Sequence, residues 1–128
     1  MRLLLDTCTF LWVAAGAAEL SATARSLFVE RENEVYLSPV STWEIVVKWS
    51  LGRLTLPRPP HEFVPEQRRR HGIAPLPLEE TAVLQLGKLP DCHRDPFDRM
   101  LVCQAIAHGM TILTPDESIG RYPVPTIW

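Results

Sequence analysis

The sequence predicts a three-layer α/β/α sandwich, an α/β fold in which helices cover both faces of a short parallel sheet, formed by residues 1–128 as one domain. Short apolar runs alternate along the chain with amphipathic segments, which is typical of parallel strands joined by crossover helices. The runs are apolar almost throughout, as expected of strands buried on both faces. A length of 128 residues suits one domain, and no internal repeat or linker divides it.

Five apolar runs are the expected strands of this sheet. The first, M-R-L-L-L-D, ends in an acid, and the others are similarly short. Open parallel sheets bind ligands beyond the carboxyl ends of their strands, so the residues that follow each run are the first candidates for function. The expected strands are Met1–Asp6, Glu34–Leu37, Ile73–Leu76, Met110–Leu113 and Val124–Ile127.

Apolar residues at helical spacing, together with helix-end signals, predict the helices. Pro96 suits the first turn of the clearest helix, and Ser21 and either Ser38 or Ser41 are expected caps. Thr55–Pro60 contains three prolines and is expected to be a loop. The expected helices are Ser21 to about Arg31, Ser38 or Ser41 to Leu51, Thr7–Ala15, His61–His71, Glu79–Lys88 and Pro96–His108.

Composition and charge exclude several classes of protein. No apolar stretch approaches the ~20 residues of a membrane helix, and the Leu3–Leu5 run is too short for a secretory signal. Cys8, Cys92 and Cys103 form an odd count without C-x-x-C spacing, which predicts neither disulfides nor zinc and indicates the reducing cytoplasm. The net charge of −2 argues weakly against avid nonspecific nucleic-acid binding, so a polyanion would need local basic patches or metal ions.

Acidic side chains recur where the expected strands and helices meet. Asp6 ends the first strand, Asp116 follows the fourth, and Glu44 lies in the helix after the second. Asp95 and Asp98 flank the start of the clearest helix. On a parallel sheet these positions converge on one rim, where close carboxylates repel one another unless a cation neutralises them. Mg²⁺ and Mn²⁺ prefer oxygen ligands, and in such a site they can activate water for attack on a phosphodiester.

Each acid also has a structural interpretation that spacing alone does not exclude. Asp6 can cap the first helix, and Asp95, directly before Pro96, is a strong helix cap. Asp98 can interact with the dipole of the helix in whose first turn it lies. Asp116 can cap a turn at Glu117–Gly120, and Glu44 can pair with Lys48 at i, i+4.

Four stretches carry a resemblance to a known family. They are L-L-L-D-T-C-T-F-L-W at Leu3–Trp12, S-T-W-E-I at Ser41–Ile45, H-R-D-P-F-D-R-M-L-V-C-Q-A at His93–Ala105 and T-P-D at Thr114–Asp116. In this order, with acids in each, they resemble the PIN domain and, more closely, the VapC-like toxins of bacterial type II toxin–antitoxin pairs. The resemblance extends to L-G-R-L-T-L-P at Leu51–Pro57 and to the closing V-P-T-I-W.

The resemblance implies a parallel α/β/α sandwich with Mg²⁺- or Mn²⁺-dependent endoribonuclease activity on RNA. The catalytic and metal-binding acids that it implies, with the last as the more variable, are Asp6, Glu44, Asp98 and Asp116. Asp95 matches an acid of the nearer subgroup and is expected behind the ligands, while Thr7 and Thr114 match hydroxyl groups that orient the acids. A cognate antitoxin that occludes the site and a homodimer are also implied.

Basic side chains supply candidates for contacts with RNA. Arg94 and Arg99 flank the acids of the clearest helix, and Lys48 lies one helical turn from Glu44, so these three are the candidate substrate-binding residues. The Arg68–Arg70 cluster is either a solvated helix face or a patch that steers phosphate toward the site.

The sequence predicts structural roles for the tryptophans and the histidines. Trp12, Trp43 and Trp49 are expected in the core or at an interface, and Trp12 and Trp49 would help to form an apolar groove for an antitoxin helix or a second copy of the chain. The four histidines share no metal-ligand spacing and are expected at the surface or at helix ends. They are His61, His71, His93 and His108.

Other functions compete with the toxin interpretation. A housekeeping PIN nuclease in RNA processing or decay has the same sequence features, and a neighbouring antitoxin gene would separate the two. Acid-held metal does not itself distinguish RNA from DNA as the substrate. A phosphoacceptor signalling domain expects a lysine after a late strand, and no lysine follows Lys88. A catalytically inactive binding module would lack one of the core acids, and none is missing.

Overall fold

The computed structural model describes residues 1–128 and contains one five-stranded sheet. Its paired strands are all parallel, and their order across the sheet is β3-β2-β1-β4-β5. The first strand of the chain therefore lies at the centre of the sheet, with β2 on one side and β4 on the other. The strands are β1 (Arg2–Leu5), β2 (Glu34–Leu37), β3 (Ala74–Pro75), β4 (Thr111–Leu113) and β5 (Thr126–Ile127).

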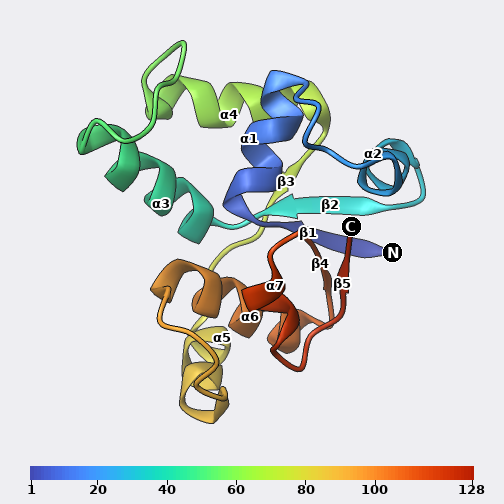
Figure 1. The fold of residues 1–128 in the computed structure, drawn as a ribbon, viewed down its shortest axis with the longest axis vertical. Helices are drawn as coiled ribbons and strands as arrows, with labels where there is room; N and C mark the ends of the chain where they lie inside the picture. Colours follow the sequence, from blue (N-terminus) through green and yellow to red (C-terminus); the bar gives the residue numbers. More distant parts are fainter.

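Helices cover both faces of this sheet, so the predicted α/β/α arrangement is confirmed (Figure 1). α1, α2 and α4 lie on one face, α5, α6 and α7 lie on the other, and α3 follows the carboxyl end of β2. None of these helices is both long enough and apolar enough to cross a membrane. The helices are α1 (Thr7–Ala15), α2 (Ala22–Val29), α3 (Pro39–Ser50), α4 (Pro60–His71), α5 (Glu80–Gln85), α6 (Pro96–His108) and α7 (Glu117–Gly120).

The alternation of side chains along β1 divides the core into two halves. Leu3 and Leu5 are fully buried in a cluster with Phe10 of α1 and Phe63 of α4. Leu4 joins a second cluster, with residues of α6 and α7, on the opposite face. Because successive residues of a strand face opposite sides of the sheet, a strand that is covered on both faces must be apolar throughout, as the sequence predicted.

Several elements are shorter than the sequence predicted: β5 contains only Thr126–Ile127 of the expected Val124–Ile127, and α2 ends at Val29 rather than at about Arg31. β3 contains only Ala74–Pro75, because Pro75 and Pro77 lack the N–H groups that would continue the ladder. The expected helix over Glu79–Lys88 ends at Gln85 and continues as a 3-10 turn that contains Gly87, a residue of low helix propensity.

Helix ends follow from specific capping residues. Ser38, rather than Ser41, caps α3: its Oγ accepts a hydrogen bond from the backbone N–H of Val40 at 3.0 Å, and Pro39 occupies the first helical position. α3 ends before Gly52, whose φ of +72° lies in the left-handed region that favours glycine.

Truncation of a β1 side chain should destabilise the whole fold. Leu4→Ala removes a fully buried side chain from the central strand and leaves a cavity against α6, so we expect a loss of about 2–5 kcal/mol in the free energy of unfolding. The matched control, Leu84→Ala, truncates a side chain that is 66% exposed and should change stability by less than about 0.5 kcal/mol. Urea denaturation measures both, and equal losses would contradict this description of the core.

Candidate active site at the carboxyl ends of the strands

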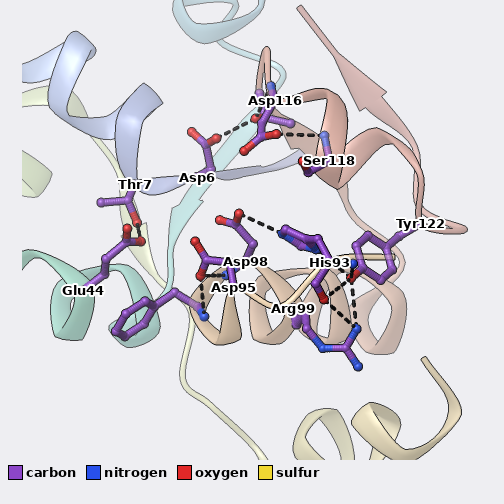
Figure 2. A network of polar contacts seen from close by, with 12 residues as sticks. Asp6, Thr7, Glu44, His93, Asp95, Asp98, Arg99, Asp116, Ser118 and Tyr122 are labelled. Atoms are coloured by element: carbon purple, nitrogen blue, oxygen red, sulfur yellow. Dashed lines mark hydrogen bonds and ion pairs between the residues drawn. The ribbon is translucent and has the colours of Figure 1, made fainter. Parts of the chain in front are cut away.

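Five acidic side chains surround one region at the carboxyl ends of the central strands (Figure 2). Asp6 follows β1, Asp116 follows β4, and Glu44 projects from α3. Asp95 and Asp98 come from the start of α6. The side chains of Asp6 and Glu44 are almost fully buried, whereas Asp116 is exposed. The convergence of these positions, which the sequence predicted from topology alone, is confirmed.

Three of the five acids are helix caps. Asp6 accepts a hydrogen bond from the backbone N–H of Thr9 at 2.8 Å and caps α1. Asp95 accepts from the backbone N–H groups of Phe97 and Asp98 and caps α6, and Asp116 caps α7. The partial positive charge at a helix N-terminus stabilises a carboxylate there, so three helices help to hold acids at one rim.

Two threonine hydroxyl groups hold carboxylates in the site. Thr7 donates to Oε1 of Glu44 at 2.6 Å, and Thr114 donates to Oδ2 of Asp6 at 2.5 Å. The Thr114 hydroxyl also accepts a hydrogen bond from the backbone N–H of Asp116 at 3.0 Å. Thr7 and Thr114 thus each donate a hydrogen bond to a carboxylate of the site, and Thr114 links the segments that follow β1 and β4.

Glu44 is paired with a cation on its own helix. The Lys48 ammonium group lies 2.5 Å from Oε2 of Glu44 and is 46% exposed, whereas the Glu44 side chain is only 6% exposed. The hydrogen bond to Glu44 raises the pKa of Lys48 above its usual value. Lys48 is therefore held as a cation at the edge of the site, with part of its surface open to solvent.

Asp98 is bonded to a histidine that the sequence analysis placed at the surface or a helix end. The Nε2 atom of His93 lies 3.1 Å from Oδ2 of Asp98, and its Nδ1 atom lies 2.7 Å from the hydroxyl of Tyr122 (Figure 2). Only 17% of the His93 side chain is exposed. The expectation for His93 was wrong, because the loop before α6 folds back over the first turn of that helix and brings the ring onto the acid.

Burial and repulsion by neighbouring carboxylates raise the pKa values of Asp6 and Asp98. Burial raises the pKa of Asp6, and the charge of Asp116 adds to this effect in spite of the opposing hydrogen bonds from Thr114 and Thr9. The pKa of Asp98 is raised to about 6, mainly by burial and further by the charges of nearby acids, while the bond to His93 opposes the rise. The site therefore disfavours the negative charge that its own side chains carry.

The three candidate substrate-binding residues differ in their surroundings. Arg94 is exposed and directly precedes Asp95 in the chain, and Lys48 is partly exposed. Arg99, in contrast, donates hydrogen bonds to the carbonyl of Pro90 at 3.0 Å and to the hydroxyl of Tyr122 at 3.0 Å. Its guanidinium group holds the loop before α6 in place, which differs from the substrate contact expected from its position in the sequence.

A comparison with known protein families identifies this architecture. The family profile of the PIN domain matches residues 3–125. The chain belongs to the PIN domain family. The PIN domain is 30% identical over 131 aligned residues to Ribonuclease VapC22 of Mycobacterium tuberculosis, a match that covers 98% of this chain and 97% of that protein.

One further relative matches part of the chain in sequence, and one solved structure matches nearly all of it in fold. Ribonuclease VapC16 of Mycobacterium tuberculosis is 35% identical over 63 residues, which is 49% of this chain and 45% of that protein, so this match spans less than half of VapC16. A chain from the crystal structure of VapBC2 of Rickettsia felis, bound to a DNA fragment from their promoter, aligns with a TM-score of 0.74 over 99% of this chain and 98% of that chain. At 13% sequence identity, this second match shows a shared fold.

PIN nucleases generally use divalent metals, and the donor atoms of this site suit such an ion. The candidate ligands are all carboxylates, the donors that Mg²⁺ and Mn²⁺ prefer, and the raised pKa values of Asp6 and Asp98 show that a cation would relieve electrostatic strain there. However, no three histidine, cysteine or acidic side chains are grouped closely enough to hold one ion together. The residues fit an ion that keeps several of its own waters, as Mg²⁺ usually does.

Two residues of the site, His93 and Tyr122, were not expected there from the sequence. His93 had a usable signal, because it lies five residues before Asp98 within the same H-R-D-P-F-D stretch. Tyr122 had none, since it lies beyond α7 and reaches the site only through the packing of that helix against α6.

The raised pKa of Asp98 predicts a pH-dependent stability in the metal-free protein. Burial and the negative charges of Asp95, Asp116 and Glu44 outweigh the hydrogen bond from His93, which favours the carboxylate, so the folded state favours protonated Asp98. The stability from this group is full below pH 3.8 and is lost as pH rises through about 6. In EDTA at pH 7.5, Asp98→Asn should therefore be more stable than wild type by about 1–3 kcal/mol, with no difference near pH 4. Thermal melting across this range tests it, and a constant difference would contradict it.

Proposed function

We propose that this PIN domain is a Mg²⁺- or Mn²⁺-dependent endoribonuclease and the toxin of a toxin–antitoxin pair. The convergence of Asp6, Glu44, Asp98 and Asp116, which come from four separate segments, carries the proposal (Figure 2). These acids are held at one rim at an electrostatic cost, which an acid-bound cation would remove. The naming of VapC22, a relative along nearly its full length, as a ribonuclease also supports it.

The acids divide into ligands and supporting groups. Asp6, Glu44 and Asp98 would hold the ion directly or through water, and Asp116 would hold that ion or a second one. When bound, the ion activates a water for attack on the phosphodiester and stabilises the leaving oxygen. Asp6 accepts one hydrogen bond at each carboxylate oxygen, which leaves further lone pairs on both oxygens for a ligand.

The remaining side chains orient the acids and bind the RNA backbone. Thr7 and Thr114 restrict Glu44 and Asp6 to one orientation through short hydrogen bonds. Lys48, which pairs with Glu44, and Arg94, which directly precedes Asp95 in the chain, are exposed cations and would contact phosphate groups of the RNA. Asp95 supports the site by capping α6, the helix that carries Asp98.

Metal-dependent RNA cleavage is the direct test. Purified protein is incubated with a mixed pool of structured RNAs in Mn²⁺ and in EDTA, and the fragments are separated on a denaturing gel. We expect cleavage in Mn²⁺ only, and a loss of at least about 100-fold in rate in Asp6→Asn and Glu44→Gln, because each removes a charged ligand. The same protein is titrated with Mn²⁺ by calorimetry.

A surface acid gives the matched control for this experiment. Glu66→Gln makes the same chemical change as Glu44→Gln at an exposed position of α4 and should cleave at the wild-type rate. Cleavage in EDTA, or full activity in Asp6→Asn, would overturn the assignment of the metal site. A folded protein that neither binds Mn²⁺ nor cuts any RNA would exclude the nuclease and leave a binding module.

An apolar groove supports an antitoxin partner. The groove lies between α1, the loop before α4 and α4 itself, and has a volume of about 530 Å³. Trp12 lines it as the sequence predicted, whereas Trp49 does not and lies exposed on α3. An amphipathic helix of an antitoxin would bury its apolar face here. The Rickettsia felis neighbour was solved within a VapBC2 complex, which is consistent with such a partner.

Growth inhibition separates a toxin from a housekeeping nuclease. Induced expression in a bacterial host should arrest growth, Asp6→Asn should abolish the arrest, and co-expression of the small reading frame adjacent to the gene should restore growth. Colony counts after induction measure this effect. RNA cleavage in vitro without growth arrest, together with no binding by the neighbouring gene product, would favour RNA processing or decay. Homodimer formation stays a prediction that sedimentation analysis of the purified protein tests.

A further inference from the structure

The hydroxyl group of Tyr122 is the centre of a polar network beside the acids. It receives a hydrogen bond from the backbone N–H of His93 at 3.2 Å and another from the guanidinium group of Arg99 at 3.0 Å. The Nδ1 atom of the His93 ring lies 2.7 Å from the same oxygen, and the His93 carbonyl oxygen lies 3.4 Å away. The Arg99 guanidinium group also lies 5.8 Å from the centre of the Tyr122 ring.

The partners of this hydroxyl determine which nitrogen of His93 carries the proton. A backbone N–H and a guanidinium N–H can only donate, so together they use the acceptor capacity of the phenol oxygen. The phenol proton must then be donated to another atom. Nδ1 of His93 is the nearest acceptor, at 2.7 Å from the phenol oxygen, whereas the His93 carbonyl oxygen lies at 3.4 Å. Nδ1 therefore accepts a hydrogen bond, and the ring proton of neutral His93 resides on Nε2.

The Nε2–H group then faces an acid of the proposed metal site. Nε2 lies 3.1 Å from Oδ2 of Asp98, so the ring donates to that oxygen. Oδ1 of Asp98 accepts no hydrogen bond from another side chain or from the backbone. One carboxylate oxygen is thus held by the protein while the other remains available.

We propose that His93 is a positioning residue for Asp98, held as the Nε2–H tautomer by Tyr122 and, through Tyr122, by Arg99. The proposal rests on the metal-dependent site proposed above. Asp98 lies in the first turn of α6 and its side chain is only 15% exposed, so its orientation depends on the few groups that contact it. Partners that hydrogen-bond to metal ligands fix the orientation of the ligands, and their loss typically lowers metal affinity by about 10–100-fold.

Two amides that mimic different nitrogens of the ring separate positioning from mere packing. The side-chain nitrogen of His93→Gln can occupy the place of Nε2 and donate to Asp98, whereas that of His93→Asn reaches only the place of Nδ1. By calorimetry we expect Mn²⁺ affinity within about 3-fold of wild type in His93→Gln and about 10–100-fold weaker in His93→Asn. Thermal melting confirms that each variant is folded, and equal affinities in the two folded variants would overturn the proposal.

Rescue of catalysis gives a second comparison for the same pair. His93 contacts Asp98 rather than substrate, so His93→Asn should lower kcat for RNA cleavage while KM changes little, and His93→Gln should recover most of kcat. A rise in KM alone in His93→Asn would show that His93 binds RNA and would contradict a positioning role.

The tautomer itself can be measured without any metal. In protein labelled with 15N-histidine, in EDTA at a pH where His93 is neutral, Nε2 should show the shift of a protonated ring nitrogen and Nδ1 that of an acceptor. Tyr122→Phe removes the donor to Nδ1 and should move both shifts toward a tautomer mixture. A wild-type ring protonated on Nδ1, or no change in Tyr122→Phe, would overturn the proposal.

The measurement of the ring shifts distinguishes the failure of the proposed nuclease function from the failure of the role proposed for His93. If wild-type protein binds no Mn²⁺, the proposed function fails, while the ring shifts in EDTA still decide how His93 is held. If Mn²⁺ binds and RNA is cut but Nδ1 carries the proton, the nuclease stands and the role given to His93 is excluded.

Discussion

The gathering of like charge at one rim of the sheet is the constraint on which the rest of the site depends. Burial and the charges of its neighbours raise the pKa of Asp98 to about 6, and burial also raises that of Asp6. The fold holds these acids together mainly with neutral donors and helix ends: Asp6 and Asp95 each cap a helix, and two threonines donate to Asp6 and Glu44. Lys48 is the one lysine or arginine paired with an acid of this set.

The order of the strands explains why the acids lie at the carboxyl end of β1. β1 lies between β2 and β4. The helices α1 and α2, which connect β1 to β2, and the helices α5 and α6, which lead to β4, cover opposite faces of the sheet. In open parallel sheets the crevice forms where the strand order reverses, beyond the carboxyl ends of the strands. Asp6 follows β1 and Asp116 follows β4, and Thr114 bonds to both of these segments. The hydrogen bond between Thr114 and Asp6 therefore holds together the segments that follow two neighbouring strands.

Positioning of the acids and recognition of partners use different parts of the molecule. The segment from His93 to Arg99 supplies Asp98, the cap Asp95 and the ring that contacts Asp98, so a short stretch before and within α6 builds one side of the site. The apolar groove that Trp12 lines lies between α1 and α4, and its residues include none of the acids. A partner bound in this groove reaches the site only by extending beyond it. Such a division would allow the proposed metal binding and the proposed antitoxin recognition to vary independently.

The sequence by itself determined the α/β class and the order of the elements, because apolar periodicity is a local property. It also led us to expect the acids at one rim, because the carboxyl ends of parallel strands lie at the same edge of a sheet. It also predicted Asp95 as a cap, since a cap acts on the next three residues. Only the tertiary structure decided that His93 contacts Asp98 and that Arg99 and Tyr122 hold the loop before α6, whereas the pairing of Lys48 with Glu44 at i, i+4 was already an option in the sequence. The contacts of His93, Arg99 and Tyr122 depend on how the segments after β4 pack against α6, and the spacing of residues in the sequence does not reveal how closely these segments approach each other.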